Sequence, residues 1–144
     1  MKISALFVAP FLLGTSLVCA AQTLKPKPLE QTLRESIGKK RVLLIAASNA
    51  KQPDFKTQKA LLATHQQELA DRDFLVLEVL YDQISATDRQ TLTQRIGPEL
   101  PTFCVVLIGK DGGAKEKSMR FILPAALFGT VDRMPMRRQE MRRK

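Results

Sequence analysis

The sequence predicts an α/β protein, a three-layer α/β/α sandwich with a mixed four-stranded sheet. Two observations support this fold class. Apolar runs of strand length alternate along the chain with segments whose apolar residues recur at helical spacing. In addition, only the short stretch "GKDGG" separates the last two predicted strands, whereas a helix separates each earlier pair. A short connection makes an antiparallel hairpin, and a helical one makes a parallel crossover.

The first residues indicate export from the cytoplasm. Lys2 gives a positive start, residues 3–18 are almost wholly apolar, and "VCA" (18–20) is the small-residue pattern of a cleavage site. We therefore interpret residues 1–20 as a signal peptide cleaved after Ala20, which predicts a secreted or periplasmic protein. A transmembrane anchor is the alternative, but the apolar stretch is short for one and contains a proline and a glycine.

The predicted mature chain is basic and holds one thiol. Its 124 residues (144 less 20) suffice for one compact domain and not for two. Cys104 is the only cysteine left, so no intrachain disulfide can form. The formal charge is +8, from 22 Lys and Arg against 14 Asp and Glu. An exported protein does not meet genomic DNA, so we expect no nucleic acid partner and instead an anionic envelope surface or another protein.

The first predicted elements lie in residues 21–38, which we interpret as an extended leader followed by a short helix. Pro28 is placed to open this helix and Gly38 to end it. Its apolar face is formed by residues four apart, namely Leu29, Leu33 and Ile37.

Two strands and a long helix follow. "RVLLIAAS" (41–48) contains a continuous apolar run from Val42 to Ala47, which indicates a strand covered on both faces. Pro53 is favourable at a helix start, and residues 54–70 are predicted to form one helix. The apolar residues of this helix are Phe55, Leu61, Leu62 and Leu69. "DFLVLEVLY" (73–81) is the second strand.

A short helix and a hairpin come next. Ser85 and Asp88 resemble a capping box at the helix start, and Gly97 with the following proline stops the helix. "TFCVVLIG" (102–109) is apolar on both faces, which predicts a central strand. "GAKEKSMRF" (113–121) is polar and rich in lysine, as is typical of an exposed edge strand.

The last predicted helix begins at Pro124, and Pro135 should end or kink it. Its apolar face is formed by Leu127, Phe128 and Val131. A right-handed parallel crossover followed by an antiparallel hairpin is the order of the thioredoxin-like fold. We assign this domain to residues 39–136 and treat residues 137–144 as a basic C-terminal tail.

The stretch "LIGKDGG" (107–113) allows two interpretations, a phosphate cradle or a hairpin turn. A phosphate-binding loop needs four residues between its glycines, then Gly-Lys-Ser/Thr and a helix, and none of these is present. Gly112 and Gly113 supply the positive φ angles that a tight turn requires. The sequence therefore predicts a turn.

A resemblance covers about residues 39–143. "LIGKDGG…K" (107–113 with Lys115) and "DRMPMRRQEM" (132–141), together with "RVLLIAAS", resemble the P-DUDES family. That family is a secreted domain of unknown function shared with Equarin and with sushi-repeat-containing proteins. The resemblance implies a thioredoxin-like fold. It implies no catalytic residue, because the family has no agreed set.

Thiol chemistry is not supported at the position where thioredoxin-like enzymes perform it. Those enzymes carry a cysteine between the first strand and its helix, and residues 46–52 contain none. Cys104 lies within the third strand and is interpreted as a small buried hydrophobic residue. The alternative is a thiol oxidoreductase or peroxide-reactive protein that uses Cys104. Pro101 occupies the place of either a thioredoxin-type cis-proline or an ordinary trans loop proline. His65 is interpreted as the edge of an amphipathic helix.

One edge of the predicted sheet gathers polar residues. The ends of the first two strands and the start of the third share this edge, where ligands of α/β sheets tend to bind. The polar residues there are Ser48, Asn49, Lys51, Asp82 and Thr102. A helix N-terminus beside a lysine suits an anion or a peptide carboxylate. The alternative is an ordinary loop.

The C-terminal stretch 133–144 carries six basic side chains against one acidic side chain. Arg137 and Arg138 are its candidate binding residues for an anionic surface, and a solvated, partly disordered tail is the alternative. We therefore predict a non-catalytic binding module for a protein or an anionic envelope component. We expect no cofactor, no metal and no transmembrane span in the mature chain.

Overall fold

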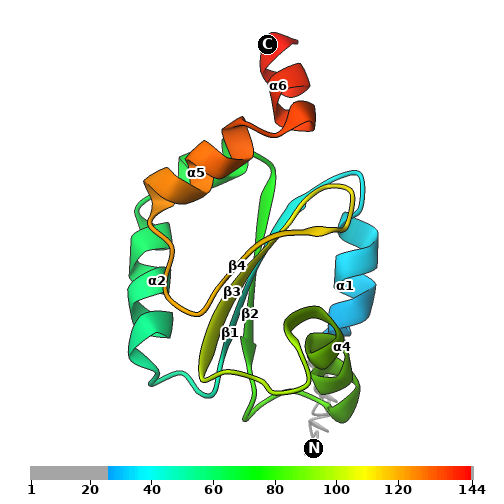
Figure 1. Ribbon diagram of the computed structural model, residues 1–144, viewed down its shortest axis with the longest axis vertical. Coiled ribbons are helices and arrows are strands. Elements are labelled where there is room, and N and C mark those ends of the chain that lie inside the picture. The colour runs from blue at the N-terminus through cyan, green and yellow to red at the C-terminus, as the bar shows by residue number, and fades with distance from the viewer. Residues whose placement is uncertain (1–25, 144) are drawn as a thin grey trace, which may run out of the picture.

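The computed structural model describes residues 26–143 (Figure 1). The predicted signal peptide at 1–20 lies outside the described residues, as does the start of the predicted leader. Within 26–143, no helix combines the length and the apolar character needed to cross a membrane.

The sheet has four strands in the order β2-β1-β3-β4. These strands are β1 (Arg41–Ala47), β2 (Phe74–Leu80), β3 (Phe103–Ile108) and β4 (Ala114–Ser118). β1 is parallel to β2 and antiparallel to β3, and β3 is antiparallel to β4. The predicted α/β fold with a mixed four-stranded sheet is confirmed. Every residue of the two central strands, β1 and β3, is buried, which explains why all of them except Arg41 are apolar.

Helices cover both faces of the sheet (Figure 1). α1 (Leu29–Ser36) and α4 (Ala86–Ile96) lie on one face. The other face is covered by α2 (Pro53–Ala63), α3 (Gln66–Asp71) and α5 (Pro124–Asp132). The last helix, α6 (Pro135–Arg142), projects beyond the sheet at the end where β1 begins (Figure 1).

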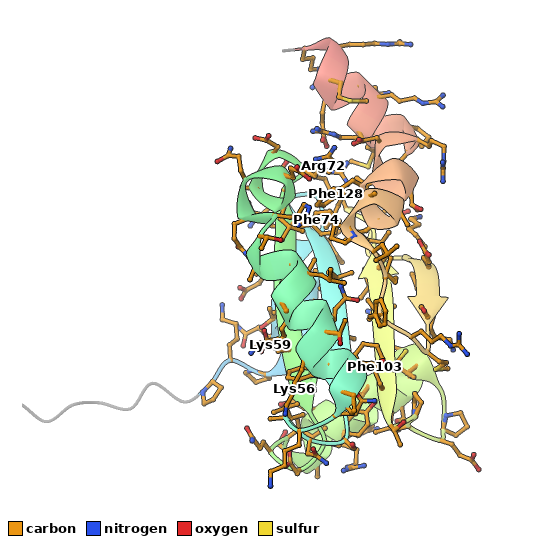
Figure 2. All side chains as sticks on the ribbon, turned by 90° about the vertical axis from the view of Figure 1, so that its left-hand side faces the viewer. Lys56, Lys59, Arg72, Phe74, Phe103 and Phe128 are labelled. Atoms are coloured by element: carbon orange, nitrogen blue, oxygen red, sulfur yellow. The ribbon has the colours of Figure 1, made fainter. Side chains whose placement is uncertain are left out.

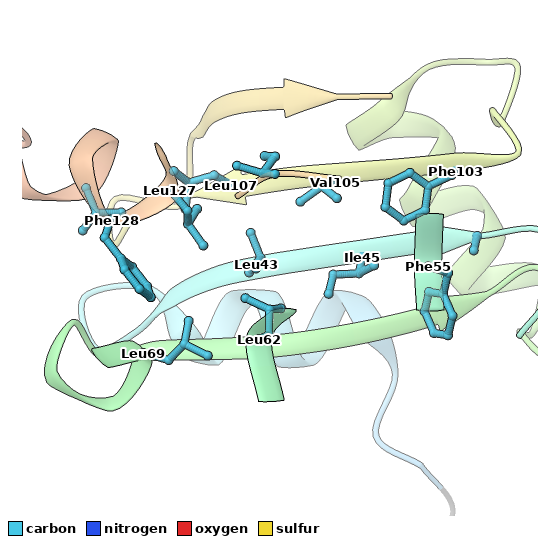
Figure 3. Packing of buried hydrophobic residues seen from close by; sticks show 13 residues of the cluster. Leu43, Ile45, Phe55, Leu62, Leu69, Phe103, Val105, Leu107, Leu127 and Phe128 are labelled. Carbon is cyan, nitrogen blue, oxygen red and sulfur yellow. The ribbon is translucent and has the colours of Figure 1, made fainter. Parts of the chain in front are cut away.

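Alternate residues of the central strands divide between two apolar clusters, as the period of a β-strand requires. Leu43 and Ile45 face α2, α3 and α5 (Figure 3), whereas Leu44 and Ala46 face α1 and α4. Burial of each leucine or isoleucine stabilises the fold by about 1.5–3 kcal/mol. The apolar core therefore holds the middle of the sheet between the two layers of helices, and the polar residues lie at the two ends of the strands.

The predicted helix at 54–70 is two helices in the structure. α2 ends at Ala63 and α3 begins at Gln66. Between them, the Thr64 hydroxyl donates to the carbonyl of Leu61 at 3.1 Å, and Nδ1 of His65 lies 2.8 Å from the same oxygen. Side chains that bond a helical carbonyl in this way compete with the backbone ladder, which accounts for the break.

Two details at the ends of helices also differ from the prediction. Ile37 does not face the core: α1 ends at Ser36, and Ile37 is 50% exposed. Asp88 does not complete a capping box within its own helix. The Ser85 hydroxyl accepts from the Asp88 amide as predicted, but the Asp88 carboxylate accepts from the Leu29 amide at 2.8 Å and so caps α1 instead.

Candidate functional site

The edge at which β1 ends gathers the residues predicted as a site. The Ser48 amide donates to the carbonyl of Thr102 at 2.9 Å, so the ends of β1 and β3 meet there. The Asn49 side chain accepts from the Lys51 amide at 2.9 Å. Asp82 follows the end of β2, which pairs with β1 along its length. The Asn49 side chain is thus used in a local turn, whereas Ser48, Lys51 and Thr102 contribute backbone groups to these bonds.

The N-terminus of α2 at this edge is already capped. The Gln52 side chain accepts from the Phe55 amide at 2.8 Å, and Asp54 places a carboxylate in the first turn. A side-chain cap and an acidic first turn satisfy the free N–H groups and the helix dipole that would otherwise attract an anion. This edge is therefore less suited to an anion than the sequence indicated.

Cys104 is fully buried, on the face covered by α1 and α4. Burial raises the pKa of its thiol, and the charge of Lys117 opposes this effect more weakly. A reactive thiol needs exposure and a lowered pKa. The interpretation of Cys104 as a small buried hydrophobic residue is therefore confirmed.

Burial also raises the pKa of Tyr81 to about 12, and its hydroxyl has no hydrogen-bond partner within residues 26–143. In the same part of the chain no peptide bond is cis, including the one before Pro101.

The opposite end of the sheet is organised by the predicted turn. The Gly112 amide donates to the carbonyl of Gly109 at 3.0 Å, and Gly112 has φ +81°, so the hairpin turn is confirmed. The predicted positive φ of Gly113 is wrong, because one left-handed residue suffices for this turn. A Cβ atom on Gly109 would lie 2.7 Å from Cε of Lys115, because the lysine stem crosses this glycine. Nζ of Lys115 is bonded to Asp111 at 2.5 Å. The residue between these groups, Lys110, is directed inward and is only 9% exposed.

Lys110 enters a cluster of charges in which the cations are largely buried and the carboxylates are partly exposed. Its ammonium donates to Asp73 at 2.8 Å and to Glu140 at 2.7 Å. The guanidinium of Arg41, 1% exposed, donates to the two carboxylate oxygens of Glu140 at 3.1 and 3.2 Å and to the carbonyl of Arg72 at 2.8 Å. Charge-assisted bonds of this geometry are among the stronger polar contacts in proteins.

Arg72 and Arg137 extend the same cluster. The guanidinium of Arg72 donates to the two carboxylate oxygens of Asp132 at 3.0 and 2.7 Å. The same guanidinium lies 4.5 Å from the ring centre of Phe128 (Figure 2). Arg137 bonds to Asp132 at 3.3 Å, to Glu140 at 3.5 Å and to the carbonyl of Asp71 at 2.8 Å. We refer to the following seven residues as the ion-pair cluster: Arg41, Arg72, Asp73, Lys110, Asp132, Arg137 and Glu140.

The electrostatics of the cluster follow from these contacts. Burial alone would raise the pKa of Glu140, but hydrogen bonds from Arg41 and Lys110, together with their charges, lower it to about 2. Burial would lower the pKa of Lys110, but hydrogen bonds to Asp73 and Glu140 raise it overall. The backbone of Asp73 has φ 53°, a left-handed conformation that aspartate tolerates better than most residues. Glu140 and Lys110 therefore stay charged near neutral pH.

The interpretation of the last residues as a solvated, partly disordered tail is wrong for 135–142. This stretch forms α6, and Arg137 is only 7% exposed. The physical reason is that Arg137 and Glu140 lie three residues apart on one helical face and find partners on the body of the domain. Arg138 is exposed and lies outside the cluster.

Sequence reasoning missed the ion-pair cluster although a signal was present. The two stretches that carry the family resemblance, 107–113 and 132–141, supply Lys110 and three further members of the cluster. Those further members are Asp132, Arg137 and Glu140. Within the described residues, no group of three or more His, Cys, Asp or Glu is placed to hold a metal ion.

The fold and the β1–α2 loop define the class of protein: a thioredoxin-like domain without a cysteine at the usual thiol position. The chain belongs to the family described as "Domain of unknown function (DUF4174)", which matches residues 32–140. This match extends past the boundary at 136 that the sequence suggested and includes most of α6. The P-DUDES name itself stays a prediction.

Relatives and solved structures agree with this assignment. The chain is 28% identical to human and to rat sushi repeat-containing protein SRPX in an alignment 141 positions long, which covers 89% of this chain. It spans only 30% of the length of those proteins. The predicted link to sushi-repeat proteins is thereby confirmed. The fold is similar to that of thioredoxin-2, a component of malaria parasite protein secretion machinery, with a TM-score of 0.51 and 10% identity. That alignment covers 66% of this chain and 84% of the thioredoxin.

Proposed function

We propose that this protein is a secreted or periplasmic, non-catalytic thioredoxin-like module that binds a phosphate-bearing anionic surface of the cell envelope. The observation that carries this proposal is the outward face of α6. Arg137 and Glu140 hold one face of the helix against the domain. Arg138 and Arg142, four residues apart, are exposed. Helical geometry places them on one side, away from the buried pair.

Further exposed side chains flank this basic face. Arg133 precedes the helix, and Arg143 follows it on the side of Arg137 and Glu140. Met141, 43% exposed, adds apolar surface beside Arg138 and Arg142. Each arginine near an anionic membrane surface contributes about 1 kcal/mol, so four of them support a weak and salt-sensitive attachment. The net charge of +9 favours the same class of partner.

The test is adsorption of the mature chain to vesicles of phosphatidylglycerol and, in parallel, to lipopolysaccharide. We expect adsorption that weakens with salt. The double variant Arg138→Gln/Arg142→Gln should lose about 2 kcal/mol, or roughly thirtyfold in affinity. Lys51→Gln/Lys56→Gln is the matched control, because both lysines are exposed and lie at the N-terminus of α2, at the opposite end of the sheet from α6. Substitution is preferable to deletion of α6, since deletion would also remove Arg137 and Glu140.

Two outcomes would reject this function. Equal adsorption by the α6 variant and the wild type would show that the arginines are not used. Adsorption that the lysine control loses equally would mean that only net charge matters. Binding to vesicles but not to lipopolysaccharide, or the reverse, would identify which source of phosphate is recognised.

The alternative function, a thiol enzyme that uses Cys104, makes an opposite prediction. Because the sulfur is buried and its pKa is raised, native Cys104 should react with a thiol reagent only on unfolding. Prompt labelling of the native protein, or peroxide consumption that Cys104→Ser abolishes, would favour the enzyme over the binding module.

A further inference from the structure

A cavity of about 290 Å³ lies beside the ion-pair cluster. It is at the small end of the range for small-molecule sites. Both sequence stretches that carry the family resemblance contribute to its walls. The lining residues are Arg41, Gly109, Lys110, Asp111, Lys115, Met134, Pro135 and Met136.

The cavity combines an apolar wall with an excess of positive charge. Met134, Pro135 and Met136 form the apolar part. Its charged lining consists of three cations and one carboxylate, because Asp111 is the only acidic residue among the lining groups. Taken together without counting any residue twice, the cavity lining and the ion-pair cluster hold five cations against four carboxylates.

The contacts of Glu140 show that these cations are arranged to bind a carboxylate. The single carboxylate of Glu140 accepts from Arg41, Lys110 and Arg137, and within residues 26–143 it is the carboxylate that all three share. Planar carboxylates suit the fork of an arginine, and a buried cation needs such a partner. Arg41 and Lys110 are 1% and 9% exposed, so they are held in place by packing before any ligand arrives.

We propose that this cavity binds a small amphiphilic anion, with its carboxylate toward Arg41 and Lys110 and its apolar body against Met134 and Met136. The carboxylate of Glu140 competes with the ligand for the same cations and so sets its affinity. This site is distinct from the outward arginines of α6, and the inference does not depend on the proposed envelope binding.

The experiment is a titration of the isotope-labelled mature chain, followed by the amide resonances of Gly109, Lys110, Asp111 and Met136. The probes are hexanoate and N-acetyl-leucine, a mimic of a peptide C-terminus, with hexanol as the uncharged control. Hexanoate or acetyl-leucine should produce saturable shifts at these amides, and hexanol should not. The tighter of the two acids identifies the source, a free short-chain acid or a peptide end.

Two variants sharpen the titration. Met136→Glu places a negative charge at the cavity and should lower the affinity for either acid about tenfold or more. Met119→Glu is the matched control, because Met119 is similarly exposed at 52% and does not line the cavity. Glu140→Gln removes the internal competitor and should raise the affinity about tenfold. If Glu140→Gln fails to fold, the affinities of Met136→Glu and Met119→Glu for the two acids still test the proposed site.

The proposal is overturned if hexanol shifts the same amides as strongly as hexanoate, or if Met136→Glu binds the acids as well as wild type does. It is also overturned if the shifts fall on Arg138 and Arg142 instead of the cavity. Arg138→Gln/Arg142→Gln should leave the titration unchanged, so failure of this site and failure of envelope binding give different results.

Discussion

The two ends of the sheet are built in opposite ways. Where β1 ends, at the usual thiol edge of the fold, the polar contacts are largely local: Asn49 bonds to Lys51, and Gln52 bonds to Phe55. Where β1 begins, Arg41 and Glu140 are bonded across 99 positions of the sequence. The first end is a set of turns, and the second joins the start of the domain to its last helix. The difference teaches that this chain concentrates its specific polar structure away from the edge at which thioredoxins react.

The ion-pair cluster is better explained as a device that positions α6 than as a source of stability for the fold. Buried ion pairs often contribute no more than well-packed apolar residues would, because desolvation offsets the attraction. Nevertheless, a pair with one member removed is strongly unfavourable. The ion-pair cluster therefore gives α6 one permitted position, since only there do Arg137 and Glu140 find their partners. This fixed position is a requirement of both proposed binding surfaces.

The largest expected effect comes from breaking the cluster at Arg41. Arg41→Met retains most of the apolar stem but leaves Glu140 with fewer cations. It should lower the free energy of unfolding by about 3–5 kcal/mol, the usual cost of removing one partner of a buried pair. Urea denaturation followed by circular dichroism measures the change.

The control for Arg41 is Arg34→Met in α1. Arg34 pairs with Glu30 at 2.8 Å, but both side chains are more than half exposed, at 74% and 58%. Exposed pairs contribute about 0–1 kcal/mol, so this variant should be nearly neutral. Equal losses for the two variants would mean that the ion-pair cluster has no special role.

The next effect is a loss of stability in acid that arises chiefly in the ion-pair cluster. The pKa of Glu140 is about 2 in the folded protein against an ordinary value of 4.5. Its stabilisation is therefore complete above about pH 4.5 and is lost as the pH falls toward 2. The full shift corresponds to an upper limit of about 3 kcal/mol. Asp132, whose pKa is lowered chiefly by its hydrogen bond from Arg72, adds to the same trend.

Glu140→Gln tests the assignment of this acid transition. The variant should be less stable than wild type at neutral pH, and the two stabilities should converge near pH 2. Chemical denaturation at several pH values gives both curves. Curves that remain parallel down to pH 2 would contradict the lowered pKa of Glu140.

The fold could be predicted because its signals are local. The uninterrupted apolar runs of β1 and β3 indicate central strands by themselves, and the glycines after Ile108 indicate a turn. The break between α2 and α3 could not be predicted in the same way. This break depends on the hydrogen bonds that the side chains of Thr64 and His65 make with the Leu61 carbonyl, and the spacing of apolar residues does not reveal such bonds.

The ion-pair cluster could not be predicted because its members are distant in sequence and ordinary in type. Arg137 and Glu140 lie in a stretch whose composition is that of a solvated tail, and nothing local shows that Arg41 is buried beside them. Only the three-dimensional fold brings the start of β1, the hairpin turn and α6 to one end of the sheet. At the other end, spacing did bring the predicted residues together, but it did not reveal that α2 was already capped.

The smallest expected effect is at the end where β1 terminates. Asn49→Ala removes one bond, from the Lys51 amide to the Asn49 side chain at 2.9 Å, and both residues are exposed. A solvent-accessible turn bond contributes about 0.5–1 kcal/mol, because water replaces the lost partner. The variant should therefore unfold within about 1 kcal/mol of wild type in the same urea experiment. A loss comparable to that of Arg41→Met would mean that this loop is as tightly specified as the ion-pair cluster, and the contrast between the two ends of the sheet would fail.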